Sequence, residues 1–189
     1  MIMITTRVAK IVEAACKKPT NYAGSSAWTY HFLPAVKYAK LMARATGADA
    51  EIVELAALLH DYASVKSNKL HKDHHIHGAR LAEKILKKLG YPQDKTARVQ
   101  YCILTHRGSV LAKKLTKEAR CLADADSMAH FDCIASLLYH AFNSRRYQMT
   151  INQAEIWLRE KLNRSYKKLS PMAKKIIKDK YKASQLLFK

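Results

Sequence analysis

Glycine and proline are scarce in this chain, with five glycines and four prolines among 189 residues. A β-rich protein of this length needs more turn residues, so the scarcity favours long helices over short strands. Hydrophobic residues make up 49% of the chain and charged residues 26%, a composition that indicates a buried core rather than a disordered chain. The sequence therefore predicts an all-α fold.

Turn residues and capping residues divide the chain into about nine predicted helices. Asp49, Asp73 and Thr116 stand where helix N-caps are expected, and Pro171 suits a first helical position. Pro34 lies inside the second helix, which predicts a kink there or a later start. The predicted helices cover residues 4–18, 28–46, 51–63, 73–89, 94–106, 117–131 with a continuation towards 142, 151–169 and 171–187, with a polar connection at 64–72.

The net charge of +19 attracts polyanions, which include nucleotides, nucleic acids and acidic membrane surfaces. The excess is densest near the end, where residues 159–189 hold eleven Lys or Arg against two acidic residues, a balance of +9. We therefore expect a main domain at 1–145 and a basic C-terminal helical extension at 146–189. The extension is expected to be dispensable for chemistry and to bind nucleic acid weakly and without sequence preference.

Signals for targeting and for disulfide bonding are weak in this sequence. The N-terminus lacks the long apolar segment of a signal peptide, and no run of about 18 apolar residues predicts a membrane span. The cysteines stand far apart and form no Cys-x-x-Cys pair, so we expect buried free thiols and a cytoplasmic protein. They are Cys16, Cys102, Cys121 and Cys133.

A histidine and an aspartate lie near the end of a strongly apolar stretch. The run from Leu55 to Ala63 is apolar enough to be buried all round, yet it contains His60 and Asp61. Burying two such groups is costly unless they pair with each other or bind a cation. A structural ion pair and a metal site are therefore the two interpretations of this doublet.

Other predicted helices add histidines and carboxylates that favour the metal site. His31 lies one helix before the doublet, and His106 ends the helix at 94–106. Helical bundles build metal sites from such side chains on facing helices, and histidines with carboxylates suit zinc, iron or manganese rather than calcium. The remaining candidates are His74, His75, His77, Asp124 and Asp126.

The order of these residues resembles that of the HD-domain superfamily of metal-dependent phosphohydrolases, and the resemblance covers residues 28–142. It rests on an Ala-rich approach to His60-Asp61, on the His-x-x-x-Gly-Ala pattern that begins at His74, and on the Ala-Asp pair that ends at Asp126. Within the superfamily, the motifs at 60–63 and 74–79 are most similar to bacterial enzymes that hydrolyse diadenosine tetraphosphate.

The resemblance implies an HD-domain helical bundle with two divalent transition metal ions in its core. Iron or manganese is expected first, with nickel, cobalt and zinc as alternatives. His74 is preferred to His77 because it alone stands four residues before Gly78. Asp126 is preferred to Asp124 by the Ala-Asp motif, although that motif occurs twice. By the resemblance, the first ion is held by His31, His60, Asp61 and Asp126, and the second by Asp61, His74 and His106.

Contacts to a substrate phosphate are less clearly marked. Many family members carry a Lys or Arg three residues after the Asp of the doublet, whereas this chain has Ser64 there. Other basic residues near the motifs are therefore the candidates. The catalytic residues that we assign are His60, Asp61, Lys66 and Arg107, with Lys69 and Arg80 as alternative phosphate contacts.

The motifs thus predict a metal-dependent phosphohydrolase or phosphodiesterase that acts on a nucleotide or a related small phosphoester. Dinucleoside polyphosphates and cyclic nucleotides are the first candidates. Two alternatives stay open: some superfamily members with a similar His-rich pair of irons are oxygenases, and a non-catalytic protein could use the fold to bind nucleotide or RNA. The oligomeric state is not predicted.

Overall fold

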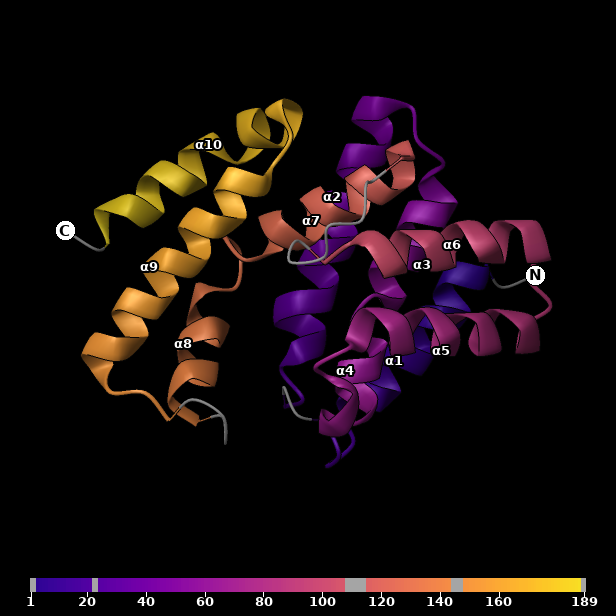
Figure 1. Cartoon of the computed structure of the whole chain (residues 1–189), viewed down its shortest axis with the longest axis horizontal. Helices are drawn as coiled ribbons and strands as arrows, with labels where there is room; N and C mark the ends of the chain where they lie inside the picture. The colour runs from indigo at the N-terminus through magenta and orange to yellow at the C-terminus, as the bar shows by residue number, and fades with distance from the viewer. Residues whose placement is uncertain (1–2, 22–23, 108–114, 144–147, 188–189) are drawn as a thin grey trace.

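The structure is a computed structural model that describes residues 3–21, 24–107, 115–143 and 148–187. Every regular element in these residues is helical, which confirms the all-α prediction (Figure 1). A π-helical turn η1 (Trp28–Phe32) and a 3-10 turn η2 (Asn68–Leu70) accompany the α-helices. The α-helices are α1 (Ile4–Cys16), α2 (Leu33–Thr46), α3 (Ala50–Leu59), α4 (Tyr62–Lys66), α5 (His74–Lys88), α6 (Gln93–Thr105), α7 (Lys117–Ala129), α8 (Ile134–Asn143), α9 (Ile151–Lys168) and α10 (Pro171–Leu186).

The helix α3 lies at the centre of the core. Ile52, Val53 and every residue from Leu55 to Leu59 are buried, because this run is apolar on all sides. The helices α1, α2, α6 and α7 pack around α3, and α5 packs against α6. The C-terminal end of α3 therefore carries the His-Asp doublet into the interior, where His60 is fully buried.

The doublet interrupts the helix that the sequence predicts over 51–63. The helix α3 ends at Leu59 and α4 begins at Tyr62, because Asp61 leaves the helical region with φ −106° and ψ 10°. Hydrophobic periodicity continues across this break and therefore could not locate it. The single predicted helix is wrong here, and the two residues that carry the motif lie in the turn between two helices.

Two further boundaries also differ from the prediction. The helix expected from 117 towards 142 is two helices, since α7 ends at Ala129 and α8 begins at Ile134. The polar connection at 64–72 is partly helical, because it includes the end of α4 and the turn η2. The apolar pattern continues past Ala129 and so hides the first boundary, whereas the second error comes from taking a polar segment to be non-helical.

The capping residues are confirmed in two cases out of three. The side chain of Asp49 accepts a hydrogen bond from the Ile52 N–H at 3.3 Å, and Thr116 accepts one from Ala119 at 3.1 Å. Asp73 occupies the N-cap position of α5 but makes no capping hydrogen bond with its side chain. Pro171 is the first residue of α10, as predicted.

The kink expected near Pro34 takes the form of the π-helical turn η1. The Leu33 N–H donates to the carbonyl oxygen of Trp28, five residues earlier, before the regular α2 begins. Wider turns of this kind are rare and often occur at functional sites. Here the turn carries His31.

The C-terminal helices α9 and α10 form a hairpin that packs on α7, and α9 also packs on α8 (Figure 1). Leu158, Leu162 and Ile177 bury apolar side chains in this contact. At the tip of the hairpin, the Ser170 N–H and hydroxyl donate to Asp124 at 2.9 and 2.6 Å. The predicted boundary between 145 and 146 lies outside the described residues, so the division into two parts stays a prediction.

Two simpler expectations can be compared with the described residues directly. The four cysteines are free and buried, as predicted. Among the described helices, none combines the length and apolar character needed to cross a membrane.

Candidate metal centre

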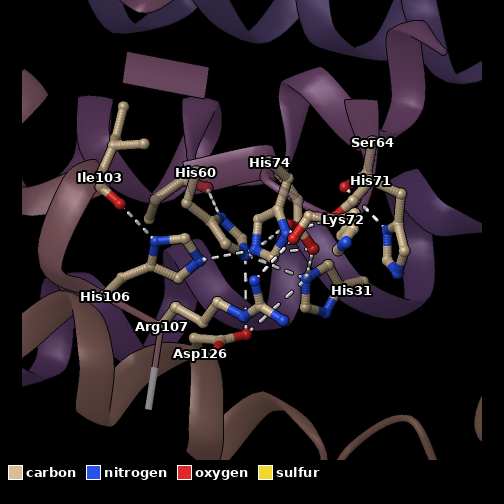
Figure 2. A network of polar contacts seen from close by, with 12 residues as sticks. His31, His60, Ser64, His71, Lys72, His74, Ile103, His106, Arg107 and Asp126 are labelled. Atoms are coloured by element: carbon tan, nitrogen blue, oxygen red, sulfur yellow. Dashed lines mark hydrogen bonds and ion pairs between the residues drawn. The ribbon is translucent and has the colours of Figure 1, made fainter. Parts of the chain in front are cut away.

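Six side chains that the sequence analysis selected as metal ligands meet at one place in the bundle (Figure 2). Five separate parts of the chain supply them: the turn η1, the break after α3, the first turn of α5, the end of α6 and the middle of α7. They form two groups, each with its ligand atoms close together. The first group is His31, His60 and Asp126, and the second is Asp61, His74 and His106.

The first group places two imidazole nitrogens next to a carboxylate. The Nε2 atoms of His31 and His60 lie 3.0 Å apart. Asp126 Oδ1 lies 3.6 Å from Nε2 of His60 and 3.8 Å from Nε2 of His31. Three potential donor atoms therefore surround one point.

The second group repeats this arrangement beside the first. The Nε2 atoms of His74 and His106 lie 3.3 Å apart, and Asp61 Oδ1 lies 3.4 Å from Nε2 of His74. The other oxygen of Asp61, Oδ2, lies 3.2 Å from Nε2 of His31. Asp61 therefore directs one oxygen to each group, which is the arrangement expected of a carboxylate that bridges two ions.

Backbone carbonyl groups hold three of the imidazole rings in position. The Nδ1 atom of each ring lies within hydrogen-bonding distance of the carbonyl oxygen three residues earlier: 2.8 Å for His60, 2.8 Å for His74 and 2.6 Å for His106. A carbonyl oxygen only accepts, so Nδ1 must carry the proton in all three rings. In the neutral rings, Nε2 is then a bare acceptor that faces the centre of the cluster. Metal-binding histidines are oriented by contacts of this kind.

The facing nitrogens give a test of whether the residues fit a metal ion. Two bare acceptors 3.3 Å apart, as in His74 and His106, repel each other unless a proton or a cation lies between them. A transition metal binds imidazole nitrogen at about 2.0–2.1 Å, which places neighbouring ligand atoms about 2.9–3.4 Å apart. The measured nitrogen separations of 3.0 and 3.3 Å fall in this range. The donor set therefore fits a divalent transition metal.

The electrostatics of the cluster keep its carboxylates ionised. Burial would raise the pKa values of Asp61 and Asp126, yet the surrounding histidines hold both well below the usual range. Burial would lower the pKa of His60, but the two carboxylates outweigh it and raise that pKa to about 9. Burial, together with the charge of His60, lowers the pKa of His106 to about 4. The cluster thus offers the negative charge that a cation requires.

Gly78 explains how the second group comes so close to the first. A Cβ atom at this position would lie 3.2 Å from the carbonyl oxygen of His60 and 3.3 Å from Cγ2 of Ile103. The absence of a side chain therefore allows α5 to approach the end of α3. His74 lies one turn earlier on α5, so this close approach brings His74 to Asp61.

The motifs left two choices between candidate ligands open, and the structure places only one residue of each choice in the cluster. His77 belongs to neither group, whereas His74 does. Asp124 is also outside both groups, because its carboxylate accepts the hydrogen bonds from Ser170. The ligand roles of His74 and Asp126 nevertheless stay predictions.

The structure places the two assigned phosphate contacts differently from each other. Lys66 is exposed at the end of α4 and does not line either cavity that borders the cluster. Arg107 follows His106 directly and donates to the Lys72 carbonyl oxygen at 2.6 Å (Figure 2). The assignments of Lys66 and Arg107 to phosphate stay predictions.

Other histidines surround the cluster, and motif matching could not have identified them. The ring of His130 stacks on His31 with centroids 6.3 Å apart, and its Nδ1 lies 2.9 Å from Ser165 Oγ of α9. His71 stacks on His74 and lies 3.1 Å from Ser64 Oγ. These contacts depend on how the helices pack and leave no pattern in the sequence.

Two cavities border the cluster. The larger, about 770 Å³, is lined by His106 and Asp126 together with residues of α9. The smaller, about 180 Å³, is lined by His31 and Asp61. His130 and Lys161 line both.

One family model matches this chain. The family model described as HD domain matches residues 28–130, which is more than half of the chain and includes all six cluster residues. No curated protein matches.

Two solved structures are similar in fold. YpgQ of Bacillus subtilis in complex with ADP superposes with a TM-score of 0.69 at 17% identity, over 94% of this chain and 90% of that one. A predicted HD superfamily hydrolase from an uncultured Thermotogales bacterium gives a TM-score of 0.58 at 22% identity, over 86% of this chain and 84% of that one. At these identities the likeness concerns the fold alone.

Proposed function

The chain belongs to the HD domain family, and we propose that it is a metal-dependent phosphohydrolase acting on a nucleotide or a related small phosphoester. The observation that carries this proposal is the convergence of four imidazole Nε2 atoms and two ionised carboxylates on two adjacent points. In the second group, the facing Nε2 atoms of His74 and His106 repel each other unless a proton or a cation lies between them, so a simple ion pair does not account for this arrangement.

The six residues would share two ions between them. His31, His60 and Asp126 would hold one, His74 and His106 would hold the other, and Asp61 would bridge them through its two oxygens. When bound, a pair of divalent ions supplies Lewis acidity and a nucleophile derived from water for attack on phosphorus. The chain itself orients the rings that would bind this pair, since the carbonyl oxygens of Ala57, His71 and Ile103 hold three of the imidazole rings in position.

The substrate that we propose is a nucleotide with a chain of phosphates. The fold neighbour YpgQ was solved in complex with ADP. The net charge of +19 favours anions, and a cavity of about 770 Å³ has the size of a site for one small molecule. The motifs at 60–63 and 74–79 add diadenosine tetraphosphate as a specific candidate within this class.

Metal analysis and a substrate screen test the proposal together. The protein is purified without chelator, its metal content is measured, and hydrolysis is followed with manganese, iron, cobalt and nickel. The screen includes diadenosine tetraphosphate, ATP, ADP and cyclic nucleotides, and Asp61→Asn serves as the inactive control. We expect about two ions per chain and hydrolysis of at least one nucleotide.

The same experiment separates the alternatives. Folded protein that takes up no metal on titration would contradict the metal centre. Metal-loaded protein that binds nucleotides without hydrolysing any would favour a non-catalytic binding protein. Oxygen consumption by the iron form, without phosphate release, would favour an oxygenase.

A further inference from the structure

The larger cavity beside the metal centre has a basic wall. Its lining includes Asp126 and His106 of the cluster, and Arg120 from the same helix as Asp126. The opposite wall is α9, which belongs to the segment that the sequence analysis placed outside the chemistry. The residues of α9 that line the cavity are Trp157, Lys161, Arg164, Ser165 and Lys168.

These α9 residues lie on one face of the helix. Trp157, Lys161 and Lys168 follow the helical period, with Arg164 and Ser165 between them at the next turn, so these side chains lie along one side of the helix. At a rise of 1.5 Å per residue, Lys161 and Lys168 are separated by about 10 Å along the helix axis. This face is fixed against α7 at two places, by the contact of Ser165 with His130 and by that of Ser170 with Asp124. The basic residues therefore form a ladder that runs along the cavity.

The positive charges of this ladder, and of Arg120 on α7, have few acidic partners. Within the described residues, Arg120, Lys161 and Lys168 form no ion pair, and Arg164 pairs only with Glu160 on an exposed surface at 3.2 Å. The acidic residues that line the cavity are already engaged, since Asp124 accepts from Ser170 and Asp126 belongs to the cluster. The cavity therefore favours an anion that carries several negative charges.

Lys161 is the member of the ladder nearest the metal centre. It lines both cavities that border the cluster, and its ammonium group lies 6.0 Å from the ring centroid of Trp157. Burial lowers the pKa of Lys161, and the neighbouring Asp126 opposes that shift. Lys161 is partly buried and forms no ion pair among the described residues, so a ligand anion that enters the cavity would be a favourable partner for its ammonium group.

We propose that Arg120, Lys161, Arg164 and Lys168 form a polyphosphate subsite that selects nucleotides with two or more phosphates. Lys161 contacts the phosphate held at the metal centre, and the other three hold the phosphates beyond it. This inference rests on the proposed function, because it requires one phosphate of the ligand to lie at the six-residue cluster. It assigns the basic α9 to substrate selection.

The test measures binding without turnover. The probes are AMP and an ATP analogue with methylene groups in place of both bridging oxygens, titrated by calorimetry into metal-loaded protein. We expect the analogue to bind about tenfold or more tightly than AMP, since its additional phosphates accept charge-assisted hydrogen bonds that AMP cannot make. The triple variant Lys161→Gln, Arg164→Gln, Lys168→Gln should lose about tenfold or more in affinity for the analogue and most of its preference over AMP.

A second triple variant controls for net charge. Arg159→Gln, Lys167→Gln and Lys175→Gln remove the same charge from residues that do not line the cavity. Because long-range charge effects are screened by salt, this variant should stay within about twofold of the parent at physiological salt. Equal losses in the two triple variants would overturn the proposal, as would a parent protein that does not prefer the analogue to AMP.

Fluorescence shows where the analogue binds. The chain has two tryptophans, so Trp28→Phe leaves Trp157 as the single reporter inside the cavity. A change in Trp157 emission on addition of the analogue is expected. Binding by calorimetry without that change would place the analogue elsewhere and overturn the proposal. An RNA oligonucleotide that displaces the analogue at physiological salt would also overturn it, by making the cavity a nucleic-acid groove.

Two controls distinguish a loss of the subsite from effects on folding or on catalysis. Helicity and thermal unfolding are compared for all variants. If the triple variant does not fold, the exposed Arg164 and Lys168 are changed to Gln while Lys161→Arg keeps the charge at position 161. Binding is measured with a non-hydrolysable probe and does not depend on turnover. A protein that hydrolyses no nucleotide would therefore contradict the proposed function, whereas the affinities alone would still test the subsite.

Discussion

Asp61 shows what a single side chain can do at a break between two helices. If α3 continued through the doublet, Asp61 would point about 100° away from His60 around the helix axis. The turn at φ −106° and ψ 10° instead lets one carboxylate lie between two groups of histidines. The sequence motif therefore predicts both residue types, whereas the geometry that makes them a pair of sites depends on the break.

The neighbouring histidines of α5 provide a matched test of the second group. If the chain binds two ions as proposed, His74→Ala should remove about one of them, because His74 would belong to the second site alone. His77→Ala should leave the metal content unchanged, since His77 lies outside both groups. Both variants are loaded with manganese, dialysed and measured by elemental analysis. An empty second site in the His77 variant alone would show that the cluster is arranged differently by one helical turn.

Motif reasoning found the six cluster residues but missed Lys161. Four of the six cluster residues are tied to local patterns, such as His-x-x-x-Gly-Ala around His74. Lys161 lies in a helix with many other basic residues, and only the packing of α9 on α7 distinguishes it from Lys167, which does not line the cavity. A solvated basic helix and a basic wall of a cavity have the same sequence pattern.

At the scale of helices, the close approach of α5 to α3 determines the distance between the two groups. Gly78 makes this approach possible, since its missing Cβ would meet the His60 carbonyl oxygen at 3.2 Å. Helix existence and type were predictable because glycine and proline mark so few breaks. The approach of two particular helices was not, because it depends on a contact between residues far apart in the chain.

Substitution of Gly78 should therefore weaken the metal centre. Gly78→Ala should cost about 1–3 kcal/mol of unfolding free energy through overpacking, and should also weaken binding of the second ion by displacing His74. Gly47→Ala is the control: its φ of 66° makes alanine unfavourable, yet no atom lies within 4 Å of the added Cβ. Urea unfolding and manganese titration measure both effects. Equal metal affinity in the two variants would show that Gly78 serves packing alone.

At the scale of the whole molecule, the basic C-terminal segment has two different faces. One face of α9 lines the cavity, whereas Lys174, Lys175, Lys178 and Lys182 of α10 line neither cavity that borders the cluster. Composition alone treats all of these residues as a single excess of charge, which is why the sequence analysis set the whole segment apart from the chemistry. The packing of the hairpin on α7 divides that charge between the wall of a cavity and a surface.

The surface face should bind nucleic acid without sequence preference. The quadruple change of Lys174, Lys175, Lys178 and Lys182 to Gln should weaken binding of a labelled single-stranded oligonucleotide at low salt. The slope of log affinity against log salt should fall by about 0.7 for each phosphate that is no longer neutralised by a lysine. Hydrolysis of a small phosphoester should stay within about twofold, because these lysines line neither cavity beside the cluster and long-range charge effects are screened by salt. Fluorescence anisotropy over a salt series measures the slope, and tight binding that resists salt would instead indicate a specific nucleic-acid site.

Asp132 joins the hairpin to the rest of the molecule. Its carboxylate accepts from the Tyr38 hydroxyl at 2.9 Å and from Lys37 at 3.2 Å, both on α2, and it also pairs with Lys180 of α10. Burial would raise the pKa of Asp132, yet the contacts from Lys180, Tyr38 and Lys37 outweigh it and lower that pKa. A group whose pKa is lower in the folded state stabilises that state only while it is ionised.

This link gives stability a pH dependence whose sign follows from the lowered pKa. Asp132→Asn should reduce the unfolding free energy by about 1–2 kcal/mol at neutral pH, a modest value because the two lysines are partly exposed. The contribution is complete above the ordinary aspartate pKa of about 3.9 and is lost as pH falls through the lower value of the folded state. Urea unfolding of parent and variant should therefore show a constant gap between pH 7 and pH 5 that narrows below about pH 4. Asp179→Asn is the control: it removes an exposed acid of α10 that forms no ion pair among the described residues, so it should change the unfolding free energy at neutral pH by less than about 0.5 kcal/mol. A gap for Asp132→Asn that does not change down to pH 3 would mean that the hydroxyl of Tyr38, rather than the ionised carboxylate, supplies the stability.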